Sequence, residues 1–354
     1  MKVTVTSRLN RRRWPSTRNA ALPGPLLPND VLDIVDEVMG EAVTPNNNKW
    51  LKTDKGFYVW SGGVKIEPSP YRLGRKINYA NSIQSMPADW KAMAGQGVSI
   101  ALIDSGVFME HPNLQQAVKT EQDFSFSEYG AQDKIGHGTH CAGLIVGKIV
   151  NDDGVGGMAP AASVFSMKAR HEVFSVSSTR LTNAIEEAIR RKVTIISMSL
   201  YLWDYKDEKF QRAVKKAAGE GIIMVAAAGE DDLLLQKSDP FYYPAYMSEE
   251  VISVGAVSRD FSSGWDISSL NNKLDLIIPF IDFTSCSIAS KNGFEKLAGS
   301  SMSAALVTGI IALAAAGKKE IKTKTQVLEV LKAITQPLTN FKDENEAVFS
   351  LYKR

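Results

Sequence analysis

The feature of this sequence that most constrains its fold is a series of apolar, β-branched runs separated by segments of helical periodicity, which occupies the chain after about residue 97. The runs are Val98–Ile103, Ser163–Lys168, Val193–Met198, Ile222–Ala227, Val251–Val257 and Leu274–Ile278. Helical patterns such as Leu181–Arg191 and Glu208–Gly219 lie between several of them. Continuous apolar runs predict strands buried on both faces, and helices between strands predict parallel pairing. We therefore expect an α/β fold, a parallel sheet flanked by helices.

The first 67 residues have a different pattern. Alternating segments at 2–6 and 56–60 are separated by clusters of Pro, Asn and Gly, which predicts a small β-barrel. Residues 68–96 are rich in Pro, Ser, Asn and Gly and have no sustained period, as is typical of linkers. We therefore expect three parts: a β-barrel domain over 1–67, a linker over 68–96 and the α/β domain over 97–354.

The composition argues against several functions. The 354 residues contain 41 Lys and Arg against 39 Asp and Glu, a balance that disfavours binding to nucleic acid or to a membrane surface. The longest apolar stretch, Ile310–Ala316, is shorter than the ~20 residues of a membrane helix. The basic start of the chain lacks the apolar core of a secretory signal, which predicts a cytoplasmic protein. Cys141 and Cys286 are expected there as free thiols.

Three short motifs contain candidate catalytic residues, and the first is an Asp-Ser-Gly sequence. Its Asp104 follows the first predicted strand, and reactive groups of open α/β sheets gather at the carboxyl ends of strands. A carboxylate in that place can accept a hydrogen bond from a histidine. Taken alone, however, the motif is better explained as a turn or a helix cap.

The second motif surrounds a histidine with glycines. Residues Gly136–Gly143 read Gly-His-Gly-Thr-His-Cys-Ala-Gly and open an apolar helix. The glycines beside His137 allow another part of the chain to approach the imidazole closely. A metal site on His137 and His140 is disfavoured, because no carboxylate or third histidine stands at a usable spacing.

The third motif places serines at the start of a long apolar helix. Gly299–Ala305 reads Gly-Ser-Ser-Met-Ser-Ala-Ala, and the apolar run continues to Ala316. The free N–H groups and the dipole at a helix N-terminus favour negative charge developing on an attacked carbonyl. Ser303 alone would be interpreted as a helix cap. The order Asp, His, Ser, each within its own glycine-bearing motif, is far more specific than any one of them.

With these motifs the chain resembles the subtilisin-like serine protease family over about 250 residues, from near Ala92 to near Pro337. The family motifs Asp-Ser/Thr-Gly, His-Gly-Thr-His and Gly-Thr-Ser-Met-Ala match at Asp104, His137 and Ser301. The resemblance implies a serine endopeptidase without a cofactor or a catalytic metal. In that mechanism Ser301 attacks the peptide carbonyl, His137 takes and returns the proton, and Asp104 holds the imidazole tautomer.

The resemblance also implies where a peptide or protein substrate binds, pairing as an additional strand. The implied substrate-binding residues are Phe174, Ser175, Val176, Ser199, Leu200, Tyr201, Ala228, Gly229 and Tyr242. Tyr201 and Tyr242 stand where the family often has Gly, so we expect a narrow specificity pocket.

One position departs from the family pattern. In the family, the strand and glycine that match Met224–Gly229 are followed by an Asn, whose side-chain amide donates a hydrogen bond to the oxyanion. In this sequence the residue at that position is Glu230. An ionised carboxylate at the oxyanion position repels the negative charge that develops there, so the sequence leaves an alternative to the active protease. That alternative is a catalytically impaired pseudoprotease that binds peptides as a scaffold.

Two further positions have a simple and a more specific interpretation. Asn151-Asp152-Asp153-Gly154 stands where many relatives bind calcium, but a solvated turn is the favoured interpretation. Cys141 directly follows the His motif, as in a thiol-containing branch of the family. We interpret it as a buried side chain rather than a nucleophile.

The N-terminal segment has a resemblance of its own. It is similar to the bacterial SH3-like domain in four short motifs that recur in that family. They are Leu-Asn-x-Arg at 9–12, Pro-Ser-Thr at 15–17, Trp-x-Lys at 50–52 and Tyr-Val-Trp at 58–60. This implies a module that binds a protein partner or lies against the catalytic domain. The alternative is an unrelated β-rich prosegment.

Overall fold

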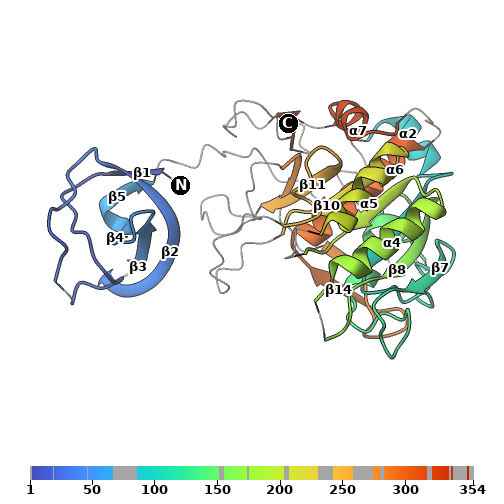
Figure 1. The fold of residues 1–354 in the computed structure, drawn as a ribbon, viewed down its shortest axis with the longest axis horizontal. Coiled ribbons are helices and arrows are strands. Elements are labelled where there is room, and N and C mark those ends of the chain that lie inside the picture. Colours follow the sequence, from blue (N-terminus) through green and yellow to red (C-terminus); the bar gives the residue numbers. More distant parts are fainter. Residues whose placement is uncertain are drawn as a thin grey trace. The chain divides into compact units, whose positions relative to one another are not determined.

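The computed structural model divides the chain into two units, Met1–Arg72 and Leu73–Arg354 (Figure 1). The residues that it describes are 2–18, 20–45, 47–66, 86–150, 155–173, 175–202, 207–229, 242–257, 274–279, 283–316, 321–334, 336–337 and 349–350.

The smaller unit is one antiparallel sheet. Its elements are β1 (Lys2–Val5), β2 (Val31–Thr44), β3 (Asn47–Thr53), β4 (Tyr58–Trp60), η1 (Ser61–Gly63) and β5 (Val64–Ile66). The strand order is β4-β3-β2-β1-β5, and each pair is antiparallel. Both segments predicted from alternation, 2–6 and 56–60, contain strands of this sheet. Val5, Leu51 and Val59 form the centre of its small apolar core.

The larger unit is built on a sheet of nine described strands, in the order β15-β16-β12-β11-β10-β9-β6-β8-β7. Its strands are β6 (Ser99–Asp104), β7 (Val118–Asp123), β8 (Ser163–Lys168), β9 (Ile195–Met198), β10 (Ile223–Ala227), β11 (Val251–Val257), β12 (Leu276–Pro279), β15 (Gln336–Pro337) and β16 (Phe349–Ser350). All neighbours from β12 to β7 pair in parallel. The predicted parallel sheet is confirmed, since each of the six apolar runs overlaps one of these strands. A separate hairpin pairs β13 (Phe283–Cys286) with β14 (Phe294–Leu297).

Three strands of this sheet, β7, β15 and β16, were not predicted. β7 is the edge strand beside β8, and its sequence Val-Lys-Thr-Glu-Gln-Asp is mostly polar. Only the first of its residues is buried. An edge strand with an exposed surface does not need the apolar run that marks a central strand, so β7 lacks the signal that revealed the others.

Helices cover both faces of this sheet. They are α2 (Ala88–Met93), α3 (His137–Val146), α4 (Ser178–Arg190), α5 (Glu208–Gly219), α6 (Ser300–Ala315) and α7 (Lys324–Leu331). Successive side chains of a strand point to opposite faces. On β6, Ile100 and Leu102 join the core beneath α3 and α6, whereas Ala101 and Ile103 join the core beneath α4 and α5. Figure 1 shows α4 and α5 side by side over the sheet.

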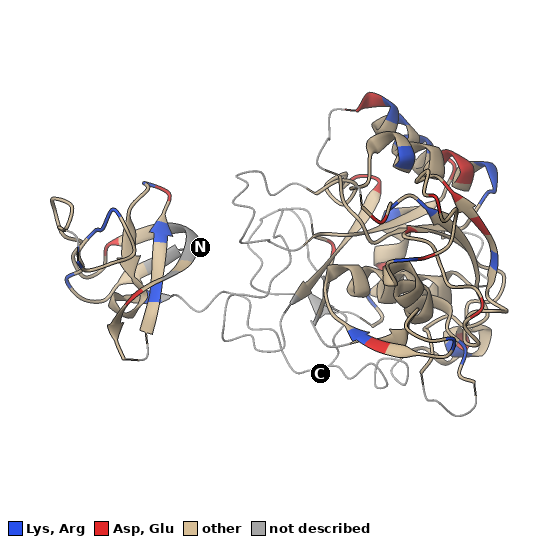
Figure 2. Cartoon of the chain, turned by 90° about the horizontal axis from the view of Figure 1, so that it is seen from below, with Lys and Arg blue, Asp and Glu red and all other residues tan. Residues whose placement is uncertain are grey.

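The helix starts differ in a way that matters for the site. Ser177 caps α4 and Asp207 caps α5, each through a side-chain oxygen that accepts a backbone N–H. In contrast, α6 begins at Gly299, with φ of 138° and no side-chain cap. A helix start without a side-chain cap favours binding of a negatively charged group of a ligand. Elsewhere on the larger unit, Figure 2 shows acidic and basic residues interspersed along the described ribbon.

Candidate active site

The fold brings the three motifs of the sequence to one place. Asp104 is the last residue of β6, His137 is the first residue of α3, and Ser301 is the second residue of α6. His137 and Ser301 line the same cavity, of about 410 Å³, at the carboxyl ends of the parallel strands. This is the edge where open α/β sheets bind their ligands.

Asp104 and His137 form a close pair. His137 Nδ1 lies 2.7 Å from Asp104 Oδ1, and the Asp104 side chain is only 1% exposed. Burial of the His137 ring opposes its protonation, but the charge and hydrogen bond of Asp104 outweigh this, so the pKa of His137 is raised above its usual value. Because a carboxylate only accepts, Nδ1 carries the proton and Nε2 is left as the acceptor.

The glycine after the histidine permits this approach. A Cβ at Gly138 would lie 2.1 Å from the Gly106 carbonyl oxygen and 3.2 Å from Asp104 Oδ1. A larger residue at this position would therefore push α3 away from the end of β6. The sequence-based expectation of a close approach beside His137 agrees with this packing.

A second carboxylate, Asp133, fixes the start of α3 and was not predicted. Its Oδ1 accepts hydrogen bonds from Gly136 N at 2.9 Å and Ser105 Oγ at 3.0 Å, and its Oδ2 accepts one from Thr139 N at 2.9 Å. Asp133 thus ties the Asp-Ser-Gly turn to the helix of His137. An Asp shortly before an apolar helix is a recognised start signal, so this role could have been found in the sequence.

Ser301 is held by the end of β9. Ser199 Oγ donates to the Ser301 carbonyl oxygen at 2.8 Å, and Ser301 Oγ lies 3.4 Å from the Ser199 carbonyl oxygen. Ser301 is half-buried, whereas Ser303 is fully buried and does not line the cavity. Of these two serines of the motif, only Ser301 has a hydroxyl at the cavity.

Most of the predicted substrate-binding residues line this cavity. The described residues that line it are His137, Arg170, His171, Glu172, Val173, Ser175, Val176, Ser199, Leu200, Tyr201, Ala227, Gly229, Ser300 and Ser301. Ala228 is buried beside it, and its N–H donates to Val254 O. Phe174 and Glu230 lie outside the described residues. The charged group at 170–172 was not predicted, because nothing in its local sequence distinguishes it from a solvated loop.

Tyr242 does not line the cavity but packs against two residues that do, Tyr201 and Gly229. Its ring packs against Tyr201, with centroids 5.1 Å apart and an interplanar angle of 74°. The ring also lies against Gly229, where a Cβ would stand 2.7 Å from Tyr242 Cδ2. Gly229 also has φ of 86°, so a side chain at this position is disfavoured both by contact with Tyr242 and by the backbone conformation. The two tyrosines therefore reinforce one wall of the cavity.

The site offers a possible ligand set for a metal, but its chemistry does not favour one. Asp104, His137 and Cys141 have ligand atoms within 4.8 Å of one another. The first two are already hydrogen-bonded to each other, and burial raises the pKa of Cys141 well above its usual value, which keeps it a neutral thiol. His140 donates from Nε2 to the Phe283 carbonyl oxygen at 3.0 Å, and burial lowers its pKa to about 4. The calcium candidate 151–154 lies outside the described residues.

A buried carboxylate on a histidine, beside a serine at an uncapped helix N-terminus, is the arrangement of a serine hydrolase. The model of the Subtilase family matches residues 95–346. The chain belongs to this family, and its enzyme class is that of a serine endopeptidase, as the sequence motifs predicted.

Individual relatives agree with this assignment. The chain is 33% identical over 259 residues to the "Intracellular serine protease" of Paenibacillus polymyxa, covering 70% of this chain and 78% of the relative. It is 35% identical over 263 residues to the "Major intracellular serine protease" of Bacillus subtilis, covering 70% and 80%. The solved structure of "Sphericase" matches with a TM-score of 0.57 and 24% identity over 71% of this chain and 90% of that one, which supports the fold. The pseudoprotease alternative is not favoured by these relatives.

Proposed function

We propose that the enzyme hydrolyses peptide bonds through Ser301, His137 and Asp104. The observation that supports this most strongly is the 2.7 Å contact between His137 Nδ1 and Asp104 Oδ1, in the cavity that Ser301 also lines. With Nδ1 donating to the carboxylate, Nε2 takes the proton of the Ser301 hydroxyl as Oγ attacks the carbonyl carbon. Asp104 stabilises the imidazolium that forms.

The steps that follow use the same groups. The tetrahedral intermediate places its negative oxygen at the N-terminus of α6, where the Ser301 N–H donates to it. The imidazolium then protonates the leaving amine, the C–N bond breaks, and an ester links the substrate acyl group to Ser301 Oγ. A water molecule, deprotonated by His137, hydrolyses this ester and frees the serine.

The substrate in this proposal is an extended peptide. Residues 175–176 and 199–201 follow β8 and β9 and lie on either side of β6, which ends at Asp104. Backbone N–H and C=O groups along such segments bind a peptide as an additional strand. We assign substrate contacts to Phe174, Ser175, Val176, Ser199, Leu200, Tyr201, Ala228 and Gly229, with Tyr242 supporting them.

Labelling with a fluorophosphonate probe tests this assignment directly. We expect the probe to phosphonylate Ser301 Oγ, as peptide mapping of the labelled protein will show, because reaction requires a serine activated by a neighbouring base. Prior unfolding should abolish labelling. Modification of another serine in the folded protein, or no modification at all, would contradict the proposal.

The oxyanion position supplies a second test. We expect Glu230→Asn to raise kcat, by up to about 10²–10³-fold, the factor lost when the corresponding amide is removed from subtilisin. The reason is that an amide donates to the oxyanion, whereas a carboxylate repels it. Steady-state kinetics on one peptide will measure the change, with Glu220→Gln, at the end of α5, as the control. Equal or lower kcat in Glu230→Asn and Glu230→Gln would show that Glu230 does not impair the site.

We also propose that residues 1–67 form an SH3-like barrel that binds a protein partner. The linker 68–96 joins it to the catalytic domain 97–354, and the end of this linker folds as α2, whose Trp90 is buried in the core of the larger unit. Support comes from the pairing of β1 with both β2 and β5, together with the bridge from Arg12, seven residues after β1, to Tyr58 in β4. These contacts join both ends of the strand order to the first twelve residues, as closure of a barrel requires. Trp14 is 59% exposed and offers an aromatic contact to a partner.

A cytoplasmic location is part of the proposal. Two relatives are named intracellular proteases. None of the described helices is long and apolar enough to cross a membrane. Peptides and proteins of the cytoplasm are then the available substrates.

A further inference from the structure

The cavity has a charged end that the proposed mechanism does not use. Arg170 is the second residue after β8, and its backbone N–H donates to the carbonyl oxygen of Asp104 at 3.1 Å. Its half-buried side chain lines the cavity with His137. The positive charge of Arg170 is near enough to oppose protonation of that imidazole. A positively charged residue therefore lines the same cavity as His137 and Ser301, at its β8 end.

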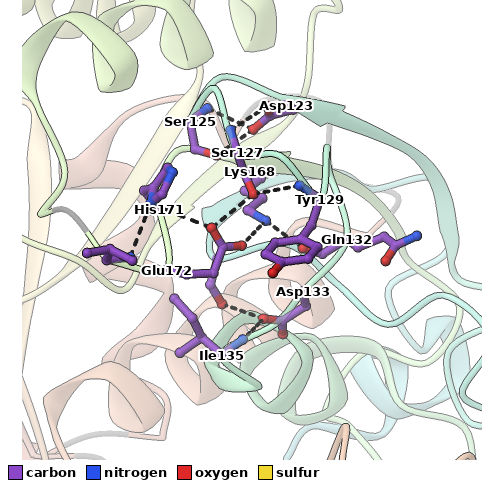
Figure 3. A network of polar contacts seen from close by, with 12 residues as sticks. Asp123, Ser125, Ser127, Tyr129, Gln132, Asp133, Ile135, Lys168, His171 and Glu172 are labelled. Atoms are coloured by element: carbon purple, nitrogen blue, oxygen red, sulfur yellow. Dashed lines mark hydrogen bonds and ion pairs between the residues drawn. The ribbon is translucent and has the colours of Figure 1, made fainter.

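The neighbouring carboxylate does not neutralise this guanidinium. Glu172 is the one carboxylate among the described residues that line the cavity. Its Oε1 accepts from Lys168 Nζ at 2.5 Å, and its Oε2 accepts from Ser127 Oγ at 2.9 Å and lies 3.6 Å from His171 Nδ1. Figure 3 shows Glu172 turned toward Lys168 within this network.

Lys168 is fully buried and is anchored on its other side. Its Nζ donates to the Gln132 carbonyl oxygen at 2.6 Å, and its side chain is 0% exposed. A buried charge is stable only when it is paired and hydrogen-bonded, so Lys168 and Glu172 hold one another in place. Their charges cancel, and no ion pair of the Arg170 guanidinium occurs within the described part of the chain. The positive charge of Arg170 remains available to a ligand.

We propose that Arg170 selects substrates with an acidic side chain close to the scissile bond. This inference rests on the proposed function and names the class of its substrate: a peptide with Asp or Glu within three residues of the bond that is cut. The planar guanidinium binds a carboxylate through two parallel hydrogen bonds. Partial burial reduces the screening that weakens such pairs on the open surface.

The position follows from the order of the strands. β6 ends at Asp104, the partner of His137, and lies between β8, which Arg170 follows, and β9, which Ser199–Tyr201 follow. Ser301 contacts Ser199 at the β9 side of the cavity. Neighbouring strands are about 4.8 Å apart, and an extended peptide advances about 3.3 Å per residue. Because β6 lies between them, β9 and β8 are two strand spacings apart, about 10 Å. An extended substrate covers this distance with about three residues.

Matched quenched-fluorescence peptides test the proposal. Both ends of each peptide are blocked, so that carboxylates come from side chains alone, and Asp is compared with Asn at each of the three positions on either side of the cleaved bond. We expect kcat/KM to be roughly tenfold higher for Asp than for Asn at one of these positions. Arg170→Met, which keeps the apolar stem, should bring that ratio to about one. Arg170→Lys should retain part of the preference.

The control and a binding measurement complete the design. Arg190→Met, on α4 with its guanidinium bound to Glu187, should leave the Asp to Asn ratio unchanged. Calorimetric binding of the same peptides to Ser301→Ala, with and without Arg170→Met, reports the preference without turnover. The proposed function fails if no peptide is cleaved and Ser301 is not labelled. If Ser301→Ala nevertheless binds Asp peptides more tightly than Asn peptides, and Arg170→Met removes this difference, recognition of acidic peptides by Arg170 stands. Ratios of about one throughout, or a preference that survives Arg170→Met, would overturn the inference alone.

Discussion

Replacing Ser301 by Ala is expected to lower kcat for peptide hydrolysis by about 10⁶-fold, the loss that removal of the nucleophile causes in subtilisin. Without Oγ no acyl-enzyme can form, and neither the imidazole nor the helix N-terminus replaces the missing nucleophile. The fold should remain intact, because Ser301 lines the cavity and the hydrogen bond of its hydroxyl among the described residues is a 3.4 Å contact with the Ser199 carbonyl oxygen. Circular dichroism and thermal unfolding will check the fold beside the kinetics.

A neighbouring serine provides the matched control. Ser303 lies one residue beyond Met302 on the same helix, and its Oγ is buried without a hydrogen-bond partner in the described structure. Ser303→Ala removes that unsatisfied hydroxyl, so turnover and stability should not fall. Full activity in folded Ser301→Ala, or loss of activity in folded Ser303→Ala, would place the nucleophile elsewhere on this helix.

The sheet could be predicted because its central strands need side chains that are apolar on both faces. The runs at Val98–Ile103 and Val251–Val257 coincide almost residue for residue with β6 and β11. Edge strand β7 needs no such run and was missed. A continuous apolar run thus reports burial on both faces, and it marks the central strands of the sheet rather than its exposed edge.

The residues of the site likewise divide into those that the sequence could predict and those that it could not. Asp104, His137 and Ser301 were identified because each lies in a glycine-bearing motif next to a strand end or helix start. Arg170 has no motif, and its charge becomes informative only when Lys168 is found to neutralise Glu172. That pairing joins residues four apart, but its significance depends on burial of the lysine. Pairing between side chains in three dimensions is the information that a single sequence lacks.

Asp104→Asn is expected to lower kcat by about 10⁴-fold while leaving Ser301 and His137 in place. An asparagine amide can donate to His137 Nδ1, which leaves the proton on Nε2 and removes the acceptor that Ser301 needs. It also cannot stabilise the imidazolium. The loss corresponds to roughly 5 kcal/mol of transition-state stabilisation. Asp207→Asn, which keeps a side-chain oxygen to cap α5, is the matched control and should keep full activity.

The pH profile of this variant separates catalysis from structure. His137 acts as a base only when it is neutral, so the activity of the wild type falls as the pH drops through its raised pKa. In Asp104→Asn the burial that opposes protonation remains and the carboxylate that favours it is gone, so the pKa of His137 should fall. The acidic limb of the residual kcat/KM should therefore move to lower pH, which a structural defect alone would not cause. A limb that stays in place or moves to higher pH would mean that Asp104 does not set the charge state of His137.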